Sequence, residues 1–502
     1  MPDAGMNRTR ARAFLGALLL AGMVLAAGLV LYRPYLDLFI FTEARQYVHD
    51  AGAVEDPASY LPEFVMPLGW NNRPASMLAF WAMRRACGYG WRCLNAAQIG
   101  LVLAGAVLLW CHGLQVLRNR ALATGLALVW LASPPVLDAV TWQATNHDKL
   151  AAVCVLAVLV VLHRACSAPH SRRVLTGMSA ALAVLTALAL NAKESAFFLL
   201  ALLPVAAGLW SLPQGRRGML RGGLVVLPAT AFCAHYVAIY LMRLDASWAG
   251  HVLSAGATGH LGDFAAYLGG ALRPGGVQTG ICLAAGAALA LLLLWHARSA
   301  RSVSALLARP DIRAALYFAC LFASAALLAV KTQFPRPYYM YIPAIGWYGL
   351  LMAMALGLGR GRPAVPRAVG ALAIALACLT LASSLRLQAS EGTLHAGLLA
   401  ASKELSRQLP ALRQRLPPDP GRPYTVVVSQ DVKCFFHFLR SGSGGIDHTL
   451  PNFLYGTGGD FSVRRVSPPQ FRRNAIASDE RVLVLDGRCG IRAAYDGRRR
   501  VL

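Results

Sequence analysis

The feature that most constrains the fold of this chain is the recurrence of apolar segments about 20 residues long. A helix needs about 20 apolar residues to cross the hydrocarbon core of a bilayer. Of the 502 residues, 57% are hydrophobic and only 14% are charged, whereas a soluble protein has about a quarter charged residues. The sequence therefore predicts an all-α polytopic membrane protein with about 11 transmembrane helices. We place the spans at residues 13–32, 96–117, 121–136, 148–164, 174–190, 195–211, 223–242, 276–296, 314–331, 339–358 and 368–386.

The positive charge of the chain indicates how the helices are oriented. A net charge of +25 would suggest a nucleic-acid partner in a soluble protein. Here the basic residues gather in alternate short loops, which is the pattern of cytoplasmic loops; these loops are 6–12, 118–120, 163–173, 214–221, 297–302 and 359–367. We expect a bacterial inner (plasma) membrane protein with a cytoplasmic N-terminus, a periplasmic C-terminus, membrane lipid around it and no nucleic-acid partner. The first span follows a basic start, and we expect a retained helix rather than a cleaved signal peptide.

The C-terminal part differs in composition from residues 1–386, which hold all the spans. An amphipathic helix is predicted over 391–415, followed by a Pro-rich linker. Short apolar runs at 424–430 and 481–487 predict buried strands. Residues 387–502 therefore predict a small α/β extracytoplasmic domain.

Four cysteines fall in segments that we expect outside the cytoplasm. Cys87 and Cys93 lie in the first outward loop, residues 33–95, and Cys434 and Cys489 lie in the C-terminal part. Two even pairs in an oxidising compartment are consistent with two disulfides. No CxxC motif occurs, so the cysteines indicate no metal site.

Polar residues stand directly before one of the apolar runs, and their position raises a question of function. The cluster consists of Trp142, Gln143, Asn146, His147, Asp148 and Lys149. Polar side chains next to hydrocarbon are costly unless they lie at the membrane surface or line a cavity. The cluster is either the wall of a cavity or a set of helix-end groups at the interface. No GxxxxGK[ST], GxGxxG, HExxH or GxSxG motif occurs, so nucleotide hydrolysis and zinc proteolysis lack their usual support.

Six short motifs follow one another at the outer ends of the predicted spans. They are "FIFTEARQYV" (39–48), "NNRPASMLAFWAM" (71–83), "LNAAQIGLVLAG" (94–105), "SPPVLDAVTWQATNHDKLA" (133–151), "NAKESAFFLLALLP" (191–204) and "RPYYMYIPAIGW" (336–347). Their order resembles the GT-C class of membrane glycosyltransferases, closest to the protein O-mannosyltransferase-like branch and its bacterial relatives. The resemblance covers roughly residues 13–386.

The resemblance implies an enzyme that moves a sugar from a polyprenyl phosphate to an acceptor hydroxyl on the periplasmic side. The acceptor would be a lipid, a glycan or a protein. The acceptor oxygen needs a carboxylate to take its proton, and the departing lipid phosphate needs Arg or Lys. No cofactor and no metal are therefore expected.

The resemblance also points to a catalytic acid in the first outward loop. The family places paired aspartates where this chain has Thr42-Glu43. Glu43 is our first candidate for the general base, and Asp50 and Asp56 are alternatives on the same loop. A solvated Glu43 paired with Arg45 or Arg73 is the bland interpretation.

The expected substrate-binding residues come from the other motifs. Arg336 is the first candidate to hold the lipid phosphate, with Lys193 and Lys331 next. Asp148 and Trp142 would wall the donor cavity, and Arg73 belongs to the "RPASMLAFWAM" motif.

Two other function classes compete with a glycosyltransferase. A membrane transporter or flippase of lipid-linked glycans predicts broken helices and charges within the spans. A non-catalytic membrane scaffold that presents the C-terminal domain is suggested by the missing first aspartate.

The charge pattern makes a direct prediction about topology. Reporter fusions after residues 120, 220 and 365 should read cytoplasmic, and a fusion after residue 420 should read periplasmic. A cytoplasmic signal at residue 420 would contradict both the topology and the extracytoplasmic C-terminal domain.

Overall fold

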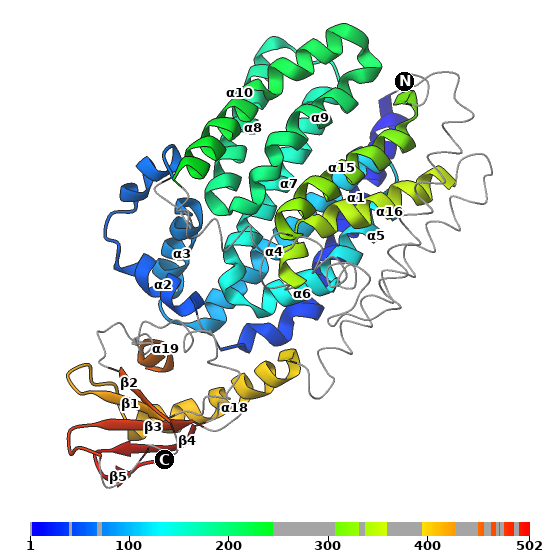
Figure 1. The fold of residues 1–502 in the computed structure, drawn as a ribbon. Coiled ribbons are helices and arrows are strands. Elements are labelled where there is room, and N and C mark those ends of the chain that lie inside the picture. Colours follow the sequence, from blue (N-terminus) through cyan, green and yellow to red (C-terminus); the bar gives the residue numbers. More distant parts are fainter. Residues whose placement is uncertain are drawn as a thin grey trace.

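A computed structural model shows a helical bundle with a small sheet at one end (Figure 1). The structure describes residues 3–39, 43–67, 73–243, 307–330, 337–358, 394–427, 450–455, 463–467, 471, 476–485 and 491–502. Two predicted spans, 276–296 and 368–386, lie outside the described residues, as does the expected Cys434–Cys489 pair. Lys331 and Arg336 lie outside them too.

The bundle confirms a polytopic helical membrane protein. Its helices are α1 (Asp3–Tyr32), α4 (Trp91–Leu117), α5 (Arg120–Leu131), α6 (Pro134–Thr141), α7 (Asn146–Ser167), α8 (Arg172–Ala192), α9 (Leu199–Ser211), α10 (Gly215–Met242), α15 (Pro310–Val330) and α16 (Pro343–Leu358). Every other predicted span falls on one of these helices or on the pair α5–α6. Among the described residues, six helical stretches are long and apolar enough to cross a membrane, or seven if the bent pair α5–α6 is one span.

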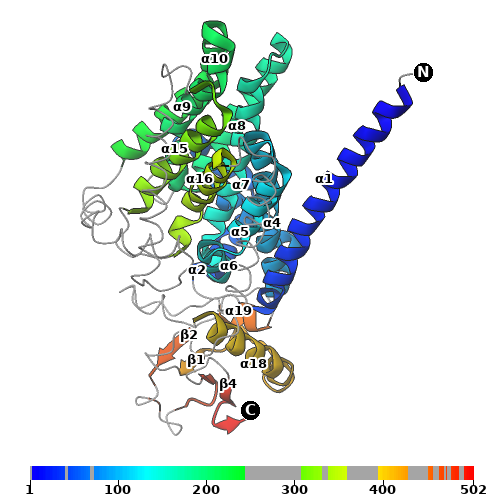
Figure 2. The same ribbon diagram turned by 90° about the vertical axis from the view of Figure 1, so that its right-hand side faces the viewer.

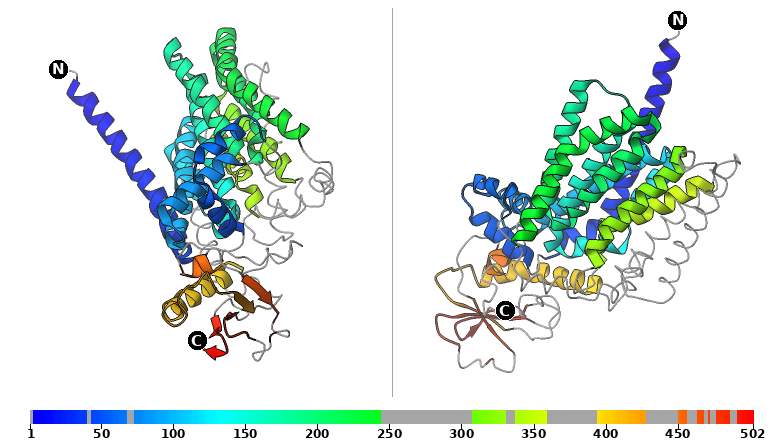
Figure 3. Two further views of the ribbon diagram at one scale, coloured as in Figure 1. Left: turned by 90° about the vertical axis from the view of Figure 1, so that its left-hand side faces the viewer. Right: turned by 45° about the horizontal axis from the view of Figure 1, so that its top comes forward.

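The outer surface of the bundle has the character of a lipid-facing surface. Large apolar side chains such as Leu19 on α1 and Leu224 on α10 are 66% and 69% exposed. Towards its N-terminal end, α1 leaves the bundle (Figures 2 and 3). Apolar exposure of this kind is unfavourable in water and neutral in lipid.

The predicted span 121–136 is broken. The helix α5 ends at Leu131, and α6 begins at Pro134 with its axis bent by 45°. Pro134 and Pro135 supply no backbone N–H, and proline disfavours a helical residue before it, so one continuous helix cannot form here. The break makes α6 a separate helix of eight residues, all of which are buried.

The first loop of the chain folds into helices at one end of the bundle. After α1 come η1 (Arg33–Asp37), α2 (Glu43–Ala53), η2 (Pro57–Phe64) and α3 (Pro74–Cys87). Cys87 and Cys93 form a disulfide that closes the turn between α3 and α4, which confirms that expected pair. The N-terminal end of α1 lies at the opposite end of the bundle (Figure 1).

The C-terminal region is a five-stranded sheet with helices beside it. The strands β1 (Tyr424–Val427), β2 (Val463–Val466), β3 (Arg481–Leu485), β4 (Ile491–Asp496) and β5 (Arg499–Arg500) are ordered β2-β1-β3-β4-β5. The strand β1 pairs in parallel with β2 and β3, and the last two pairings are antiparallel. The predicted strands thus exist, in a sheet with more strands than we expected.

The helix α18 (Leu394–Arg415) joins this sheet to the bundle, with α19 (Leu450–Tyr455) beside it. Its buried residues include Leu398, Leu405, Leu409 and Leu412, which recur at the three- and four-residue spacing of one helix face. The amphipathic helix predicted over 391–415 is confirmed.

Glycines allow α15 and α16 to pack closely. A Cβ added at Gly346 would lie 2.4 Å from the backbone nitrogen of Phe322. Small residues at such contacts let helix backbones approach in membranes.

Gly346→Ala should therefore lower the thermal stability of the purified protein. The added methyl group meets backbone that cannot move aside, and overpacking costs about 1–3 kcal/mol. Gly177→Ala on α8 is the matched control, because nothing lies within 4 Å of a Cβ there. Equal melting temperatures of the two variants would show that α15 and α16 do not pack as described.

Candidate active site

The polar cluster that precedes α7 is buried at the end of the bundle where the first loop lies. Gln143, Asn146, His147, Asp148 and Lys149 are each 5% exposed or less, and Trp142 is half-buried. Buried polar groups at this depth require partners within the protein. The burial of these five residues within the protein favours the cavity wall over helix-end groups at the membrane interface.

The first turn of α7 packs under the first loop through His147. Its ring makes edge contacts with Tyr47 of α2, at a centroid distance of 4.8 Å, and with Phe80 of α3, at 5.5 Å. Neither ring nitrogen of His147 has a hydrogen-bond partner among the described residues. The imidazole thus serves mainly as an aromatic spacer between the loop and the bundle.

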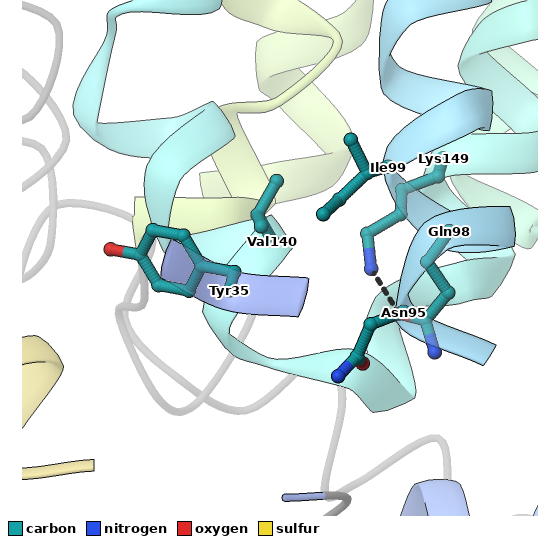
Figure 4. A pocket seen from close by; sticks show the side chains of 6 residues that line it. All are labelled: Tyr35, Asn95, Gln98, Ile99, Val140 and Lys149. Atoms are coloured by element: carbon teal, nitrogen blue, oxygen red, sulfur yellow. Dashed lines mark hydrogen bonds between the residues drawn. The ribbon is translucent and has the colours of Figure 1, made fainter. Parts of the chain in front are cut away.

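Lys149 points into the bundle rather than toward the membrane surface. Its Nζ atom donates a hydrogen bond of 2.9 Å to Oε1 of Gln98 on α4. Both side chains line a narrow pocket together with Tyr35, Asn95, Ile99 and Val140 (Figure 4). A lysine that is 0% exposed is rare in proteins without a paired group, and the amide of Gln98 supplies that group.

An ion pair connects the first loop to the junction of α8 and α9. Arg73, just before α3, binds Glu194 with two hydrogen bonds, Nε to Oε2 at 3.0 Å and Nη2 to Oε1 at 2.6 Å. Lys193 Nζ lies 3.5 Å from the same Oε1 atom. The side chains of Arg73 and Lys193 are 9% and 14% exposed. Two cations therefore share one carboxylate, which leaves positive charge in excess.

The charges on α7 and in the loop influence one another. Asp148 interacts electrostatically with Lys193, Arg73, Glu194 and Lys149. Burial disfavours the charged form of Arg73, but Glu194 outweighs this effect and raises the pKa of the guanidinium above its ordinary value. Arg73, Lys193, Lys149, Glu194 and Asp148 form what we call the charged cluster. Its three basic side chains outnumber its two carboxylates, and two of them, Arg73 and Lys193, lie at the carboxylate of Glu194.

The expected catalytic acids lie on the first outward loop, in or next to α2 and η2. Glu43 is the first residue of α2, four positions before Tyr47, whose ring contacts His147. Asp50 is exposed near the end of the same helix. Asp56 is exposed and caps η2 by accepting a hydrogen bond of 2.9 Å from the Ala58 amide, which gives it a local structural role. The bidentate partner of Arg73 is Glu194, whereas the non-catalytic interpretation of Glu43 pairs that residue with Arg45 or Arg73.

The short helix η6 (Pro337–Met340) begins directly after Arg336. It packs against α6, and the backbone amide of Tyr338 donates a hydrogen bond of 3.3 Å to Asp138. Tyr338 and Tyr341 both interact electrostatically with Asp148. The segment that follows Arg336 is thus anchored beside the charged cluster.

The structure adds polar residues that we did not select from the sequence. Asn95 and Gln98, three apart on α4, both line the pocket (Figure 4). The signal that could have found them is the i, i+3 spacing of two amides in an otherwise apolar helix. Among the described residues, no group of three or more His, Cys, Asp or Glu side chains is placed to hold a metal ion.

The architecture is a GT-C-like fold. In a comparison of solved structures, the chain superposes on ArnT from Cupriavidus metallidurans, whose crystal structure has undecaprenyl phosphate bound, with a TM-score of 0.51. The superposition covers 96% of this chain and 97% of that chain, at 13% sequence identity. No protein-family model and no curated protein sequence matches the chain. At this identity the likeness establishes the fold alone, and the O-mannosyltransferase-like branch stays a prediction.

The ion pair at the centre of the site should be important for stability. Arg73→Gln leaves the carboxylate of Glu194, whose side chain is 30% exposed, with only the more distant Lys193. We expect a loss of about 1–3 kcal/mol in the free energy of unfolding, the usual cost of an unpaired buried polar group. Chemical denaturation in mixed micelles measures it.

Arg92→Gln is the matched control, because Arg92 pairs with Asp37 at the surface, where the two side chains are 74% and 53% exposed. Exposed ion pairs contribute less than about 1 kcal/mol. An Arg92→Gln loss as large as that of Arg73→Gln would contradict the central position of the Arg73–Glu194 pair.

Proposed function

We propose that the protein is a glycosyltransferase that moves a sugar from a polyprenyl phosphate to an acceptor hydroxyl, on the periplasmic side of the bacterial inner membrane. The observation that carries this proposal is the charged cluster, buried at one end of a GT-C-like bundle. Two of its cations, Arg73 and Lys193, share the single carboxylate of Glu194 at the end of the bundle where the first loop lies. ArnT, which shares the fold, has undecaprenyl phosphate bound in its crystal structure.

The reaction requires two groups from the protein. The acceptor oxygen attacks the anomeric carbon and loses its proton to a carboxylate. The bond between the anomeric carbon and the phosphate oxygen breaks, and its electron pair stays on the departing lipid phosphate. A base and a cationic site are therefore needed on opposite sides of the sugar.

Lys193 is the described residue best placed to hold the lipid phosphate. Its contact with Glu194, at 3.5 Å, is longer than that of Arg73, so it can turn to a phosphate oxygen without breaking the Arg73–Glu194 pair. Arg336 and Lys331, which precede η6 in the sequence, complete the proposed phosphate site. Asp148, Arg73 and the half-buried Trp142 form the proposed wall of the donor cavity.

Glu43 is the proposed general base. It starts α2, about one turn before Tyr47, whose ring contacts His147. Asp50, exposed near the end of the same helix, is the first alternative. Asp56 is the weaker alternative because its carboxylate already caps η2.

A flippase of lipid-linked glycans is the second candidate function. The broken pair α5–α6 and the fully buried Lys149 are features that transporters also show. Both lie at the same end of the bundle as the charged cluster, which fits a one-sided enzyme better than a pathway across the membrane.

The test is transfer of a labelled sugar by the purified protein. Lipid vesicles containing the protein receive a panel of polyprenyl-phosphate sugars and lipid, glycan or peptide acceptors. We expect labelled acceptor to form without added metal and in the presence of EDTA. Loss of label from the donor leaflet without any labelled acceptor would support the flippase instead.

Glu43→Gln should lower kcat about 10²–10⁴-fold, the usual share of general-base catalysis. The amide keeps the shape of the side chain but cannot accept the proton. Glu43→Asp should retain part of the activity, and Glu63→Gln on the same loop should retain all of it. Full activity of Glu43→Gln would move the role to Asp50 or Asp56, and full activity of all three amide variants would contradict the acid mechanism.

A further inference from the structure

The backbone between η1 and α2 is held by side-chain amides from the bundle. Asn95 on α4 donates through Nδ2 to the carbonyl oxygens of Leu36, at 3.2 Å, and Leu38, at 2.6 Å. Gln143 donates through Nε2 to the carbonyl oxygen of Phe39, at 3.3 Å, and to Oδ1 of Asn95, at 2.9 Å. Two side-chain amides that contact each other thus hold the backbone of residues 36–39 from the side of the bundle.

The C-terminal region also holds the backbone of this segment, through a residue of α18. The backbone N–H of Phe39 donates a hydrogen bond of 2.9 Å to Oγ of Ser402, which is 363 positions away on α18. The Ser402 hydroxyl in turn donates to the Leu398 carbonyl at 2.8 Å. Phe39 is 0% and Ser402 is 2% exposed, so water does not replace this partner in the folded protein.

The helix α18 is itself tied to the sheet. Oε1 of Gln408, less than two turns beyond Ser402, accepts a hydrogen bond of 2.6 Å from the backbone amide of Ile491 at the start of β4. Phe453 of α19 also packs edge-on against Tyr89 of the first loop, at a centroid distance of 5.0 Å. The C-terminal domain therefore reaches the Phe39 backbone through a continuous series of contacts.

The position of Phe39 in the chain gives this contact its meaning. Phe39 stands four positions before Glu43, the first residue of α2. A displacement of about 1 Å at a reacting group can cost a factor of about 100 in rate. Because only three residues separate Phe39 from Glu43, the hydrogen bond between Phe39 and Ser402 limits how far the start of α2 can move.

We propose that Ser402 is a positioning residue. Through it, the C-terminal domain helps to fix the position of Glu43. By accepting the Phe39 N–H, Ser402 completes the hold that Asn95 and Gln143 exert on the segment leading to Glu43. The catalytic consequence rests on the proposed transferase function. The structural consequence, a fixed Phe39 amide, does not.

The experiment compares a graded series at position 402 in the full-length protein. Ser402→Thr keeps the hydroxyl, Ser402→Cys keeps the size with a weaker acceptor, and Ser402→Ala removes it. We expect kcat to fall about 10- to 100-fold in Ser402→Ala, less in Ser402→Cys and little in Ser402→Thr. The KM for the lipid-linked donor should stay near that of the wild type, because the phosphate is held elsewhere.

A second measurement works without any activity. Hydrogen–deuterium exchange of a peptide spanning Leu36 to Ala44 should speed up in Ser402→Ala and Ser402→Cys and stay slow in Ser402→Thr. Ser406→Ala, one turn along α18 and half-buried, is the matched control and should change neither exchange nor kcat.

The outcomes separate the two proposals. Faster exchange in Ser402→Ala with an unchanged kcat would overturn the positioning role, and unchanged exchange would overturn the contact itself. Wild-type protein that transfers no sugar, yet shows the exchange pattern, would overturn the transferase and leave the structural hold of α18 on the Phe39 segment confirmed. A uniform change of donor KM and kcat with a lowered melting temperature in all three variants would show general unfolding and overturn the positioning role.

Discussion

Charges that leave water at the edge of a membrane domain need partners, and Arg73 and Glu194 are the pair around which this site is built. The guanidinium and the carboxylate meet through two hydrogen bonds, at 2.6 and 3.0 Å, and join residues 121 positions apart. Arg73 precedes α3, and Glu194 opens the break between α8 and α9. The pair therefore fastens the first loop to the bundle at the point where the chain turns.

Neighbouring contacts depend on this fastening. Ser76, on the first turn of α3, donates a hydrogen bond of 2.9 Å to the Ala192 carbonyl at the end of α8. With α3 held, Phe80 and the adjoining Tyr47 of α2 close over His147. The first loop thus covers the start of α7, and the carboxylate of Asp148 comes under the influence of Arg73 and Lys193. The proposed phosphate site depends on this ion pair, because Lys193 shares its carboxylate.

Much of the fold could be predicted from the sequence, because burial of apolar segments in lipid is a local property. The spans that fall on described helices, the amphipathic α18, the two predicted strands and the Cys87–Cys93 disulfide follow from composition, spacing and compartment. The break at Pro134 was visible as two prolines, although the predicted span ran through it. The strand β2, with the sequence VRRV, lacks the apolar run that marks a buried strand, and sequence patterns did not indicate it.

The candidate site was harder to predict, because its partners lie far apart in the chain. Glu194 directly follows Lys193 in the sequence and contacts it at 3.5 Å, but its closest partner is the distant Arg73, at 2.6 Å. Lys149 was grouped with the polar cluster that precedes α7, and its contact with Gln98 inside the bundle could not be read from that grouping. The contact of Ser402 with the Phe39 amide has no trace in either local sequence. Long-range hydrogen bonds of this kind appear only when the fold is known.

The central claim is that the excess positive charge beside Glu194 binds the phosphate of a lipid carrier. Its most direct test is the affinity of the purified protein for a polyprenyl phosphate, compared with the uncharged polyprenol of the same chain length. We expect the phosphate to bind at least about tenfold more tightly, a difference of about 1.4 kcal/mol. Lys193→Gln should remove most of that difference, and Lys403→Gln on the exposed face of α18 should not. Equal affinities for the phosphate and the alcohol in the wild-type protein, or an unchanged preference in Lys193→Gln, would contradict a phosphate site at Lys193.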